Sequence, residues 1–144
     1  MAKQLTVFLE NRPGRIKSVS DILLENKLNI WAFTIQDRGE FGLMKVIVDK
    51  PKQAHLALVE KGFACAIKEV VAICAKDKPG NLEKLTTLLL QNEVNIADAY
   101  GFVSPNDRQG MCFLELKNPR QVDVPKLLAS AGFEILDDEK LYEI

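Results

Sequence analysis

Two short turns, each built around a Pro-Gly pair, hold the residues of this chain that are best suited to chemistry. They are Asn11-Arg12-Pro13-Gly14-Arg15 and Asp77-Lys78-Pro79-Gly80-Asn81. Because glycine has no Cβ, another group can approach the main chain closely beside Gly14 and Gly80. If a helix starts there, its first amides and its dipole form a seat for a carboxylate. The residue types therefore indicate an anion-binding turn that is present twice.

The same turns are also good places to begin a helix. Asn11 and Asp77 are of the residue types that cap helix N-termini. Pro13 and Pro79 suit a first helical turn, because the amide that proline lacks would have no partner there. A Pro-Gly pair that only starts a helix, without a ligand, is thus a second interpretation. A duplicated module repeats its structural turns too, so the repetition does not choose between the two.

The two halves of the chain are copies of one pattern. Residues 7–16 align with residues 73–82 at an offset of 66 (73 − 7), and Asn29-Ile30 aligns with Asn95-Ile96 at the same offset. Farther along, the offset grows to 68 at Gly42 and Gly110, and to 70 at Gly62 and Gly132. These steps indicate small insertions in loops, where insertions cost little.

Each half has the pattern of strand, helix, strand, strand, helix, strand. Alternating apolar residues predict the strands, and apolar residues at helical spacing predict the helices. The second strand of the first half is expected over residues 29–36, and a turn over residues 37–42. The apolar positions of the first half are Leu5, Val7, Leu9, Ile16, Val19, Leu23, Met44, Val46, Val48, Ala54, Ala57 and Leu58. Their counterparts are Val71, Ile73, Ala75, Leu82, Leu85, Leu89, Cys112, Leu114, Leu116, Val124, Leu127 and Leu128.

This order of elements predicts an α+β fold made of two ferredoxin-like βαββαβ modules. Two right-handed βαβ crossovers joined by a hairpin give an antiparallel sheet in the strand order 4-1-3-2, with both helices on one face. We place the modules at residues 1–69 and 70–144, because a fourth strand passes almost directly into a first strand near Glu69-Val70. Thr6, Phe8, Ile47 and Phe113 predict a partly apolar open sheet face that is suited to self-association.

Composition narrows the classes of protein further. The formal net charge is -1 and the pI is about 5.9, which gives no general attraction to nucleic acid or to anionic membranes. No apolar run approaches the roughly 20 residues that span a bilayer, and the start Met1-Ala2-Lys3-Gln4 has no signal-peptide pattern. The three cysteines are expected to be free thiols in a cytoplasmic protein. With one histidine and no Cys-x-x-Cys pair, we expect neither a metal site nor a cofactor.

At these residues each half resembles an ACT domain, a small regulatory module found with many enzymes of amino-acid metabolism. The resemblance covers essentially the whole chain. It is carried by the Asn/Asp-x-Pro-Gly-x-Leu/Ile turn, by the helix positions after it and by the Asn-Ile entry to the second strand. The residues are Asn11 to Ile16, Val19, Leu23, Asn29 and Ile30 in one half, and Asp77 to Leu82, Leu85, Leu89, Asn95 and Ile96 in the other.

The resemblance implies that two such modules pair side by side through their second strands into an eight-stranded sheet, with a free amino acid bound at the interface. The turn of one module would then face the start of the second strand of the other. One implied site combines Asn11, Arg12, Pro13, Gly14 and Arg15 with Asn95, Ile96, Ala97, Asp98 and Tyr100. The reciprocal site combines Asp77, Lys78, Pro79, Gly80 and Asn81 with Asn29 and Trp31.

The two implied sites differ where a ligand would contact them. Ala97 and Ala99 leave room beside Asp98, whose carboxylate could bind an ammonium group, whereas Trp31 and Phe33 place bulk in the equivalent positions. We therefore expect the site that includes Asp98 to be the better one. A solvated charge on a strand is the plain alternative for Asp98.

The function predicted from the sequence is an amino-acid-binding regulatory or sensor protein, without a catalytic domain of its own. Its expected partners are an enzyme of amino-acid metabolism and a second copy of the chain in a homodimer. An enzyme would need a nucleophile with a base, paired carboxylates or a metal cluster, and the sequence shows none of these patterns. A structural or partner-binding pair of modules with no small ligand is the main alternative. RNA binding, suggested by the shared βαββαβ topology, is disfavoured because the second copy lacks stacking aromatics around Met111.

Overall fold

The computed structural model describes residues 1–117 and 121–141 of the chain. Contacts between Cα atoms divide it into two compact units. One unit is Lys3–Lys68, and the other runs from Glu69 onward and includes Met1–Ala2. These units are called the first and the second module below.

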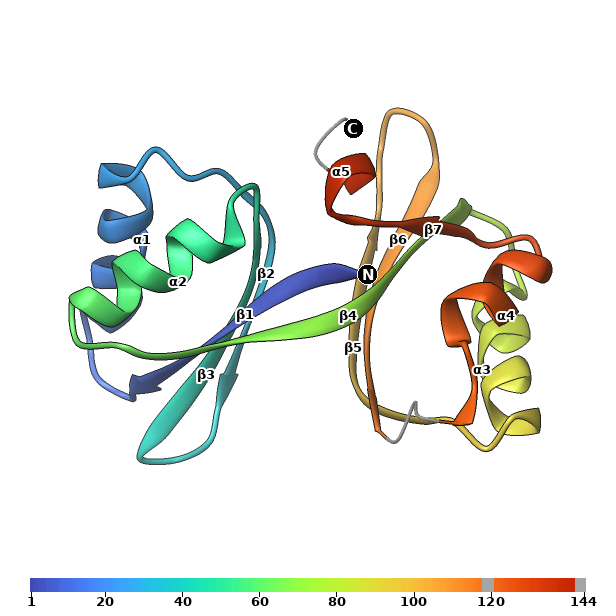
Figure 1. Cartoon of the computed structure of the whole chain (residues 1–144), viewed down its shortest axis with the longest axis horizontal. Helices are drawn as coiled ribbons and strands as arrows, with labels where there is room; N and C mark the ends of the chain where they lie inside the picture. Colours follow the sequence, from blue (N-terminus) through green and yellow to red (C-terminus); the bar gives the residue numbers. More distant parts are fainter. Residues whose placement is uncertain (118–120, 142–144) are drawn as a thin grey trace. The chain divides into compact units, whose positions relative to one another are not determined.

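The first module is a four-stranded antiparallel sheet covered on one face by two helices (Figure 1). The sheet has the order β2-β3-β1-β4, which is the predicted order 4-1-3-2. In β1 and β3 the register runs from the pair Leu5 and Val46 to the pair Glu10 and Phe41. The elements are β1 (Ala2–Glu10), α1 (Arg15–Glu25), β2 (Ile30–Asp37), β3 (Phe41–Val48), α2 (Pro51–Glu60) and the start of β4 (Ala64–Lys76).

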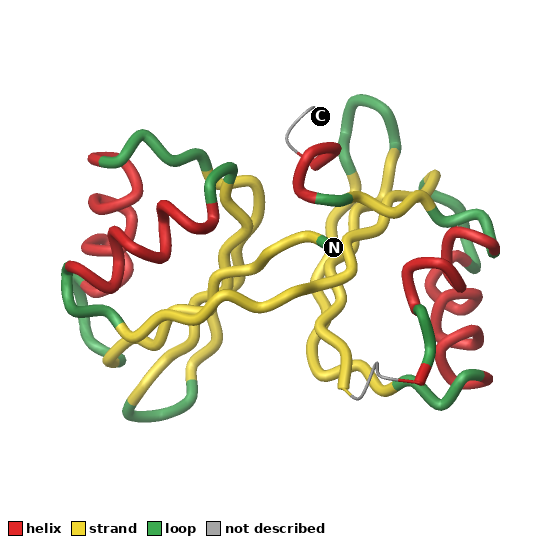
Figure 2. The backbone as a smooth tube through the Cα atoms, in the orientation of Figure 1, coloured by secondary structure: helices red, strands yellow, loops and turns green. Residues whose placement is uncertain are grey.

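The second module repeats this plan, with the two helices that correspond to α1 and α2 again on one face of the sheet (Figure 2). Its strands follow the order β7-β4-β6-β5, which is once more 4-1-3-2. The register of β4 and β6 runs from the pair Val71 and Leu114 to the pair Lys76 and Gln109. The elements after β4 are α3 (Asn81–Gln91), β5 (Asn95–Val103), β6 (Gln109–Lys117), α4 (Val124–Ser130), β7 (Glu134–Leu136) and a short helix α5 (Asp138–Leu141).

The strand β4 belongs to both modules. It runs without interruption from Ala64 to Lys76, so its first part is the fourth strand of the first module and its second part is the first strand of the second. The two ferredoxin-like modules predicted from the repeat are confirmed. The expected number of eight strands becomes seven in the part of the chain that the structure describes, because one long strand fills two places.

Each module has its own hydrophobic core between the sheet and the helices. The predicted core positions are buried, Leu5, Val7 and Leu9 in the first module and Val71 and Ile73 in the second. The predicted alternation is not seen there, because the intervening Thr6, Ala72 and Cys74 are buried as well. The remaining buried members of the first core are Val19, Ile22, Leu23, Leu28, Met44, Val46, Val48, Ala54, Ala57, Leu58 and Phe63. Those of the second are Leu85, Leu89, Val94, Leu114, Val124, Leu128 and Phe133.

Two groups of apolar residues differ from the prediction. Ile16 and Leu82 are 44% and 70% exposed, and they are the second residues of α1 and α3, at the open end of each helix. Three of the four side chains expected on an open sheet face are buried, at 3% exposure for Thr6, 0% for Ile47 and 1% for Phe113. Only Phe8, at 47% exposure, matches the expected apolar surface.

The second strand of each module is an edge strand of its sheet. Among the described residues β2 is paired with β3 and β5 with β6, and neither has a strand on its other side. The expected joining of β2 to β5 is therefore wrong for strands of one chain. Each edge strand carries a register shift near its start, between Ile30 and Ala32 and between Ile96 and Asp98.

Candidate functional site

Both Pro-Gly pairs form the same tight turn just before a helix. Gly14 has φ 89° and ψ -12°, and Gly80 has φ 91° and ψ -9°. Proline followed by a glycine with positive φ is the pattern of a type II turn, closed here by main-chain bonds of 3.5 Å from Arg15 to Arg12 and 3.3 Å from Asn81 to Lys78. The N-cap of each helix is therefore the glycine, Gly14 or Gly80, and not the residue three places earlier, Asn11 or Asp77.

This geometry corrects the expected roles of Asn11 and Asp77. The helices begin at Arg15 and Asn81, without a side-chain cap, so these two residues do not cap them. The prolines also lie before the helix and not in its first turn. The physical reason is that a type II turn needs its glycine in the left-handed region, and that residue cannot itself be helical.

The main chain beside both glycines is open. A Cβ built on Gly14 or on Gly80 would meet no other atom within 4 Å. After each turn, the next main-chain bonds run from Ser18 N to Gly14 O and from Lys84 N to Gly80 O, each at 2.9 Å. The amides between the turn and these bonds belong to Ile16, Lys17, Leu82 and Glu83. In the described part of the chain these four have no main-chain partner outside the helices. Such amides at a helix start can bind an anion.

In the first module, Asn11 holds the turn against the hairpin between β2 and β3. Its side-chain amide donates to Asp37 Oδ1 at 3.1 Å and to Gly39 O at 2.8 Å, and its main-chain amide donates to Glu40 O at 3.2 Å. Arg12 pairs with Glu10 at 2.7 Å on the surface. The turn is thus fixed by hydrogen bonds of an uncharged side chain, one of them to a carboxylate, and its arginine is occupied by a neighbouring carboxylate.

In the second module, an ion pair replaces the asparagine. The Asp77 carboxylate pairs with Arg108 Nη2 at 2.6 Å, and Asp77 N donates to Arg108 O at 2.8 Å. Asn81 Nδ2 donates to Lys76 O at 2.6 Å. Among the described residues neither Lys76 nor Lys78 forms an ion pair, so two ammonium groups flank this turn.

A small cavity lies beside the first turn. Its volume is about 80 Å³, and Arg15 is one of the residues that line it. The Arg15 guanidinium lies 4.6 Å from the centre of the Phe63 ring, and its Nε atom is buried without a hydrogen-bond partner. The other lining residues are Leu9, Glu10, Asn11, Arg12, Ile16, Ile35, Gln36, Asp37 and Gly42.

A much larger cavity, of about 350 Å³, lies at the equivalent place in the second module. It includes Asp77, Lys78 and Asn81 of the turn and reaches the core residues Ile73, Leu85 and Phe133. Ligand pockets in proteins usually have volumes of about 300–1,000 Å³. The remaining lining residues are Ala75, Lys76, Leu82, Gly101, Phe102, Val103, Gly110, Met111 and Cys112.

The sequence-predicted residues of the second strands, apart from Tyr100 in the middle of β5, lie toward the far end of each sheet from the turn of their own module. Asn29 N donates to Asp49 Oδ1 at 3.0 Å, beside the pair of Ile30 and Val48. In the second module Asn95 is paired with Lys117. Within one module the structure therefore separates the turn from Asn29, Trp31, Asn95, Ile96, Ala97, Asp98 and Tyr100.

Tyr100 has a defined place beside the edge strand. Its ring stacks on Phe113, with the ring centres 5.2 Å apart. Burial raises the pKa of the Tyr100 phenol well above its ordinary value, and the carboxylates of Asp98 and Glu115 raise it further. The hydroxyl of Tyr100 therefore stays protonated at neutral pH, as a donor next to Asp98. Burial also raises the pKa of the Cys112 thiol in the cavity wall, so that this thiol is a weak nucleophile.

Sequence reasoning missed the residues that face each turn within its own module. These are Ile35, Gln36 and Asp37 in the first module and Gly101, Phe102 and Val103 in the second. They come together because the first and second strands run in the same direction on either side of the third. Gly42 is paired with both Leu9 and Asp37, and Gly110 with both Ala75 and Val103. The predicted strand order already implied this proximity, because it places the first and second strands on either side of the third.

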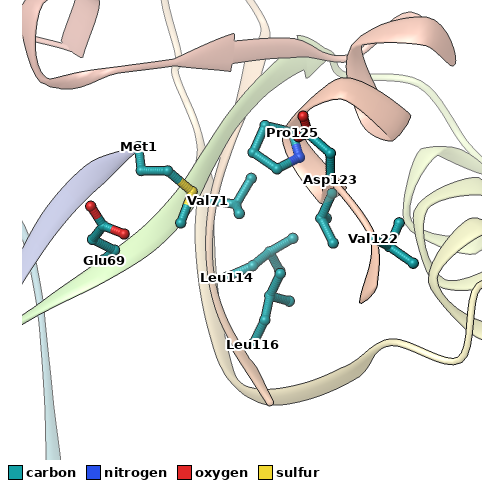
Figure 3. Close-up of a pocket in the computed structure, with 9 residues that line it drawn as sticks. Met1, Glu69, Val71, Leu114, Leu116, Val122, Asp123 and Pro125 are labelled. Atoms are coloured by element: carbon teal, nitrogen blue, oxygen red, sulfur yellow. The ribbon is translucent and has the colours of Figure 1, made fainter. Parts of the chain in front are cut away.

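The second module has another cavity near the opposite end of its sheet. It has a volume of about 280 Å³ and is lined by Val71, Leu114, Leu116, Val122 and Pro125, among others (Figure 3). Most of these side chains are apolar, and Asp123 in its wall is engaged as the cap of α4, accepting from Lys126 N at 3.1 Å. Its charged side chains are the carboxylates of Glu69 and Asp123, so it has no pair of lysines like the one beside the second turn.

Two other findings bear on the class of protein. Among the described residues, no group of three or more histidine, cysteine, aspartate or glutamate side chains could hold a metal ion. None of the described helices has the length and apolar character needed to cross a membrane.

The fold and the paired turns define a tandem protein built from two βαββαβ modules. The chain belongs to the ACT domain pair family, whose model matches residues 1–143. No curated protein matches the sequence.

Solved structures share this architecture. Protein BT0572 from Bacteroides thetaiotaomicron is 31% identical, with a TM-score of 0.89 over 99% of this chain and 96% of that one. The regulatory subunit of aspartate kinase from Thermus thermophilus, in a ligand-free form, is 15% identical, with a TM-score of 0.61 over 90% of this chain and 92% of that one. Aspartokinase alpha and beta subunits are 12% identical, with a TM-score of 0.57 over 91% of this chain and 97% of that one. The last two likenesses concern the fold alone.

Proposed function

We propose that this chain is an amino-acid-binding regulatory protein that holds the carboxylate of its ligand at a Pro-Gly turn. The observation that carries the proposal is the open main chain beside Gly14 and Gly80, where an added Cβ would meet nothing within 4 Å. Amides at the start of α1 and α3 adjoin this space, and the helix dipoles favour a negative charge there. A cavity lies next to each turn.

In the fuller form of this proposal, the start of a second strand from another module completes the site. Asp98 would then bind the ammonium group of the amino acid, with the Tyr100 hydroxyl beside it. The support for this part is that β2 and β5 are edge strands, whose outer sides have no strand partner among the described residues. A second copy of the chain in a homodimer could supply the missing neighbour.

The regulatory role would be exerted on a separate enzyme of amino-acid metabolism in the cytoplasm. Solved structures with this fold include a chain described as the regulatory subunit of aspartate kinase. The free thiols Cys65, Cys74 and Cys112 are in keeping with a reducing compartment. Binding would change the conformational equilibrium of the pair and thereby the activity of its partner.

A thermal-shift screen with each of the twenty amino acids tests this proposal. A ligand at a hundred times its dissociation constant should stabilise the protein by about 2.7 kcal/mol. Calorimetry should then give a dissociation constant for each compound that raises the melting temperature. Asp98→Ala should weaken binding at least tenfold if Asp98 holds the ammonium group. The proposal fails if none of the twenty changes the melting temperature at millimolar concentration.

One observation favours a second candidate function, a partner-binding pair without a small ligand. The first module exposes large apolar side chains, with exposures of 60% for Phe33, 48% for Phe41 and 47% for Phe8. Surfaces of this kind often bind another protein. Light scattering after size exclusion distinguishes the two functions when it is combined with the screen. Self-association without a thermal shift from any amino acid would favour this candidate.

A further inference from the structure

We infer that the cavity beside the second turn is the ligand site of this chain, and that its ligand is a small carboxylate with an apolar side chain. This inference rests on the proposed function and adds to it the choice of module and the chemical class of the ligand. It comes from a comparison of equivalent positions in two modules of the same fold.

Four positions around the second turn carry a smaller residue than their counterparts in the first module. The pairs are Leu9 and Ala75, Arg15 and Asn81, Ile35 and Gly101, and Met44 and Cys112. Each of the four smaller residues lines the larger cavity. These replacements account for the difference between a volume of about 350 Å³ in the second module and about 80 Å³ in the first. The smaller volume is the space of roughly three water molecules.

The backbone keeps one of these positions small. A Cβ on Gly101 would lie 2.5 Å from Met111 O, a distance that forces the strands apart. Ile35 occupies the same place in the first module and lines the smaller cavity. The pairing of β5 with β6 therefore excludes a side chain at Gly101 unless the strands move.

Charge also differs between the two cavities. The first is lined by Glu10, Arg12, Arg15 and Asp37, whose formal charges cancel. The second is lined by Lys76, Asp77 and Lys78, with a formal sum of +1, and the single carboxylate among them is already paired with Arg108 at 2.6 Å. The second cavity therefore attracts a carboxylate. It has no unoccupied acid in its wall to select an ammonium group.

The wall of the cavity is suited to an apolar body. Phe102 and Val103 line it, where the first module has Gln36 and Asp37. Ile73, Leu85 and Phe133 close its inner end and are at most 5% exposed. Burial of an apolar side chain against such a wall is favourable by about 25 cal/mol per Å². A ligand with its carboxylate at the turn would place its side chain here.

An amino acid and the keto acid with the same side chain share this chemistry, and calorimetry separates them. The probes are L-leucine, its keto acid, glycine and acetate, each titrated into the full chain. L-leucine or its keto acid should bind at least tenfold more tightly than glycine or acetate. Glycine binding as tightly as leucine would overturn the inference, because the apolar wall would then contribute nothing.

The decisive variant is the double substitution Ala75→Leu and Cys112→Met, which restores the residues that pack at these positions in the first module. We expect affinity for the preferred probe to fall at least tenfold. Ala64→Leu is the matched control, because it is the same change in the same strand at an exposed position outside the cavity. Its affinity should equal that of the unchanged protein.

The outcomes separate this inference from the proposed function. If leucine binds and the double variant binds it equally well, the site lies elsewhere and only the inference fails. If the keto acid binds and no amino acid does, the inference stands and the amino-acid function fails. If none of the four probes binds but another of the twenty amino acids does, only the inference fails. If neither the probes nor any of the twenty amino acids binds, both fail.

A second measurement covers the case in which the double variant does not fold. The preferred probe should slow alkylation of Cys112 in the unchanged protein, because Cys112 lines the cavity, and should leave Cys65 unaffected. Peptide mass spectrometry resolves the two thiols. Equal alkylation of Cys112 with and without the probe would overturn the inference.

Discussion

The two Pro-Gly turns have nearly identical backbones and different surroundings. Gly14 and Gly80 differ by 2° in φ (91 − 89), and both precede a helix of 11 residues. Yet the first turn is held by the neutral side chain of Asn11 and the second by the ion pair between Asp77 and Arg108. The backbone conformation is fixed by proline and glycine, whereas the space and charge beside it depend on strand residues farther along the chain.

The comparison separates the requirements of folding from those of binding. Both modules need the glycine, because a side chain in the left-handed region is strained. Only the second module has small residues at Ala75, Gly101 and Cys112, and these leave a cavity that reaches its core. A void next to a core costs stability, so its presence in one module alone indicates a use for it.

The largest expected effect tests whether each module has a core of its own. Leu58 and Leu128 occupy equivalent positions and are both 0% exposed. Leu58→Ala and Leu128→Ala should each lower the free energy of unfolding by about 2–5 kcal/mol, because each leaves a cavity in a packed core. Urea unfolding followed by circular dichroism measures both. A loss under about 1 kcal/mol in either variant would contradict the assignment of a separate core to that module.

The next largest expected effect distinguishes the role of the turn in stability from the role of the cavity in ligand binding. Gly14→Ala and Gly80→Ala should each cost about 1–2 kcal/mol of stability, since both impose a left-handed conformation on alanine. Only Gly80→Ala should also weaken ligand binding. Thermal unfolding and calorimetry give the two quantities.

Asparagine tolerates the left-handed region better than alanine, so Gly14→Asn and Gly80→Asn are the matched controls. They should retain more stability than the alanine variants. Equal losses for asparagine and alanine would show that the positive φ is not the cause. Weaker binding from Gly14→Ala alone would assign the ligand to the first module.

The fold could be predicted from the sequence because the pattern of each element occurs twice, once in each copy of the repeat. Val7 and Ile73 at equivalent positions both predicted the first strand, and the strand order followed from the topology rules. The exposure of Ile16 and Leu82 was missed, since helical spacing alone does not place the edge of a buried stripe. The helix caps were missed because Asn11 and Asp77 are common cap residues, and the type II turn moved the helix start to the glycines.

The candidate site was predicted less completely. The turns were identified because proline and glycine have strong local conformational preferences. The cavity was not, because its size depends on Ala75, Gly101 and Cys112, which are separate in sequence and meet only through the registers of β4, β5 and β6. Comparing the repeats position by position for side-chain volume would have identified these residues.

The smallest expected effect concerns the two ways of holding the turns. Arg108→Ala should lower stability by about 0.2–1 kcal/mol, because its pair with Asp77 is near the surface, with the arginine side chain 75% exposed. Asn11→Ala should cost about 1 kcal/mol for the loss of two hydrogen bonds. In about 1 M salt the effect of Arg108→Ala should shrink, because charges at the surface are screened. The effect of Asn11→Ala should change less with salt, because Asn11 carries no charge and one of its two bonds is to a main-chain carbonyl. Urea unfolding at low and high salt measures both. Equal salt dependence of the two variants would contradict the distinction between an ion pair and the hydrogen bonds of an uncharged side chain.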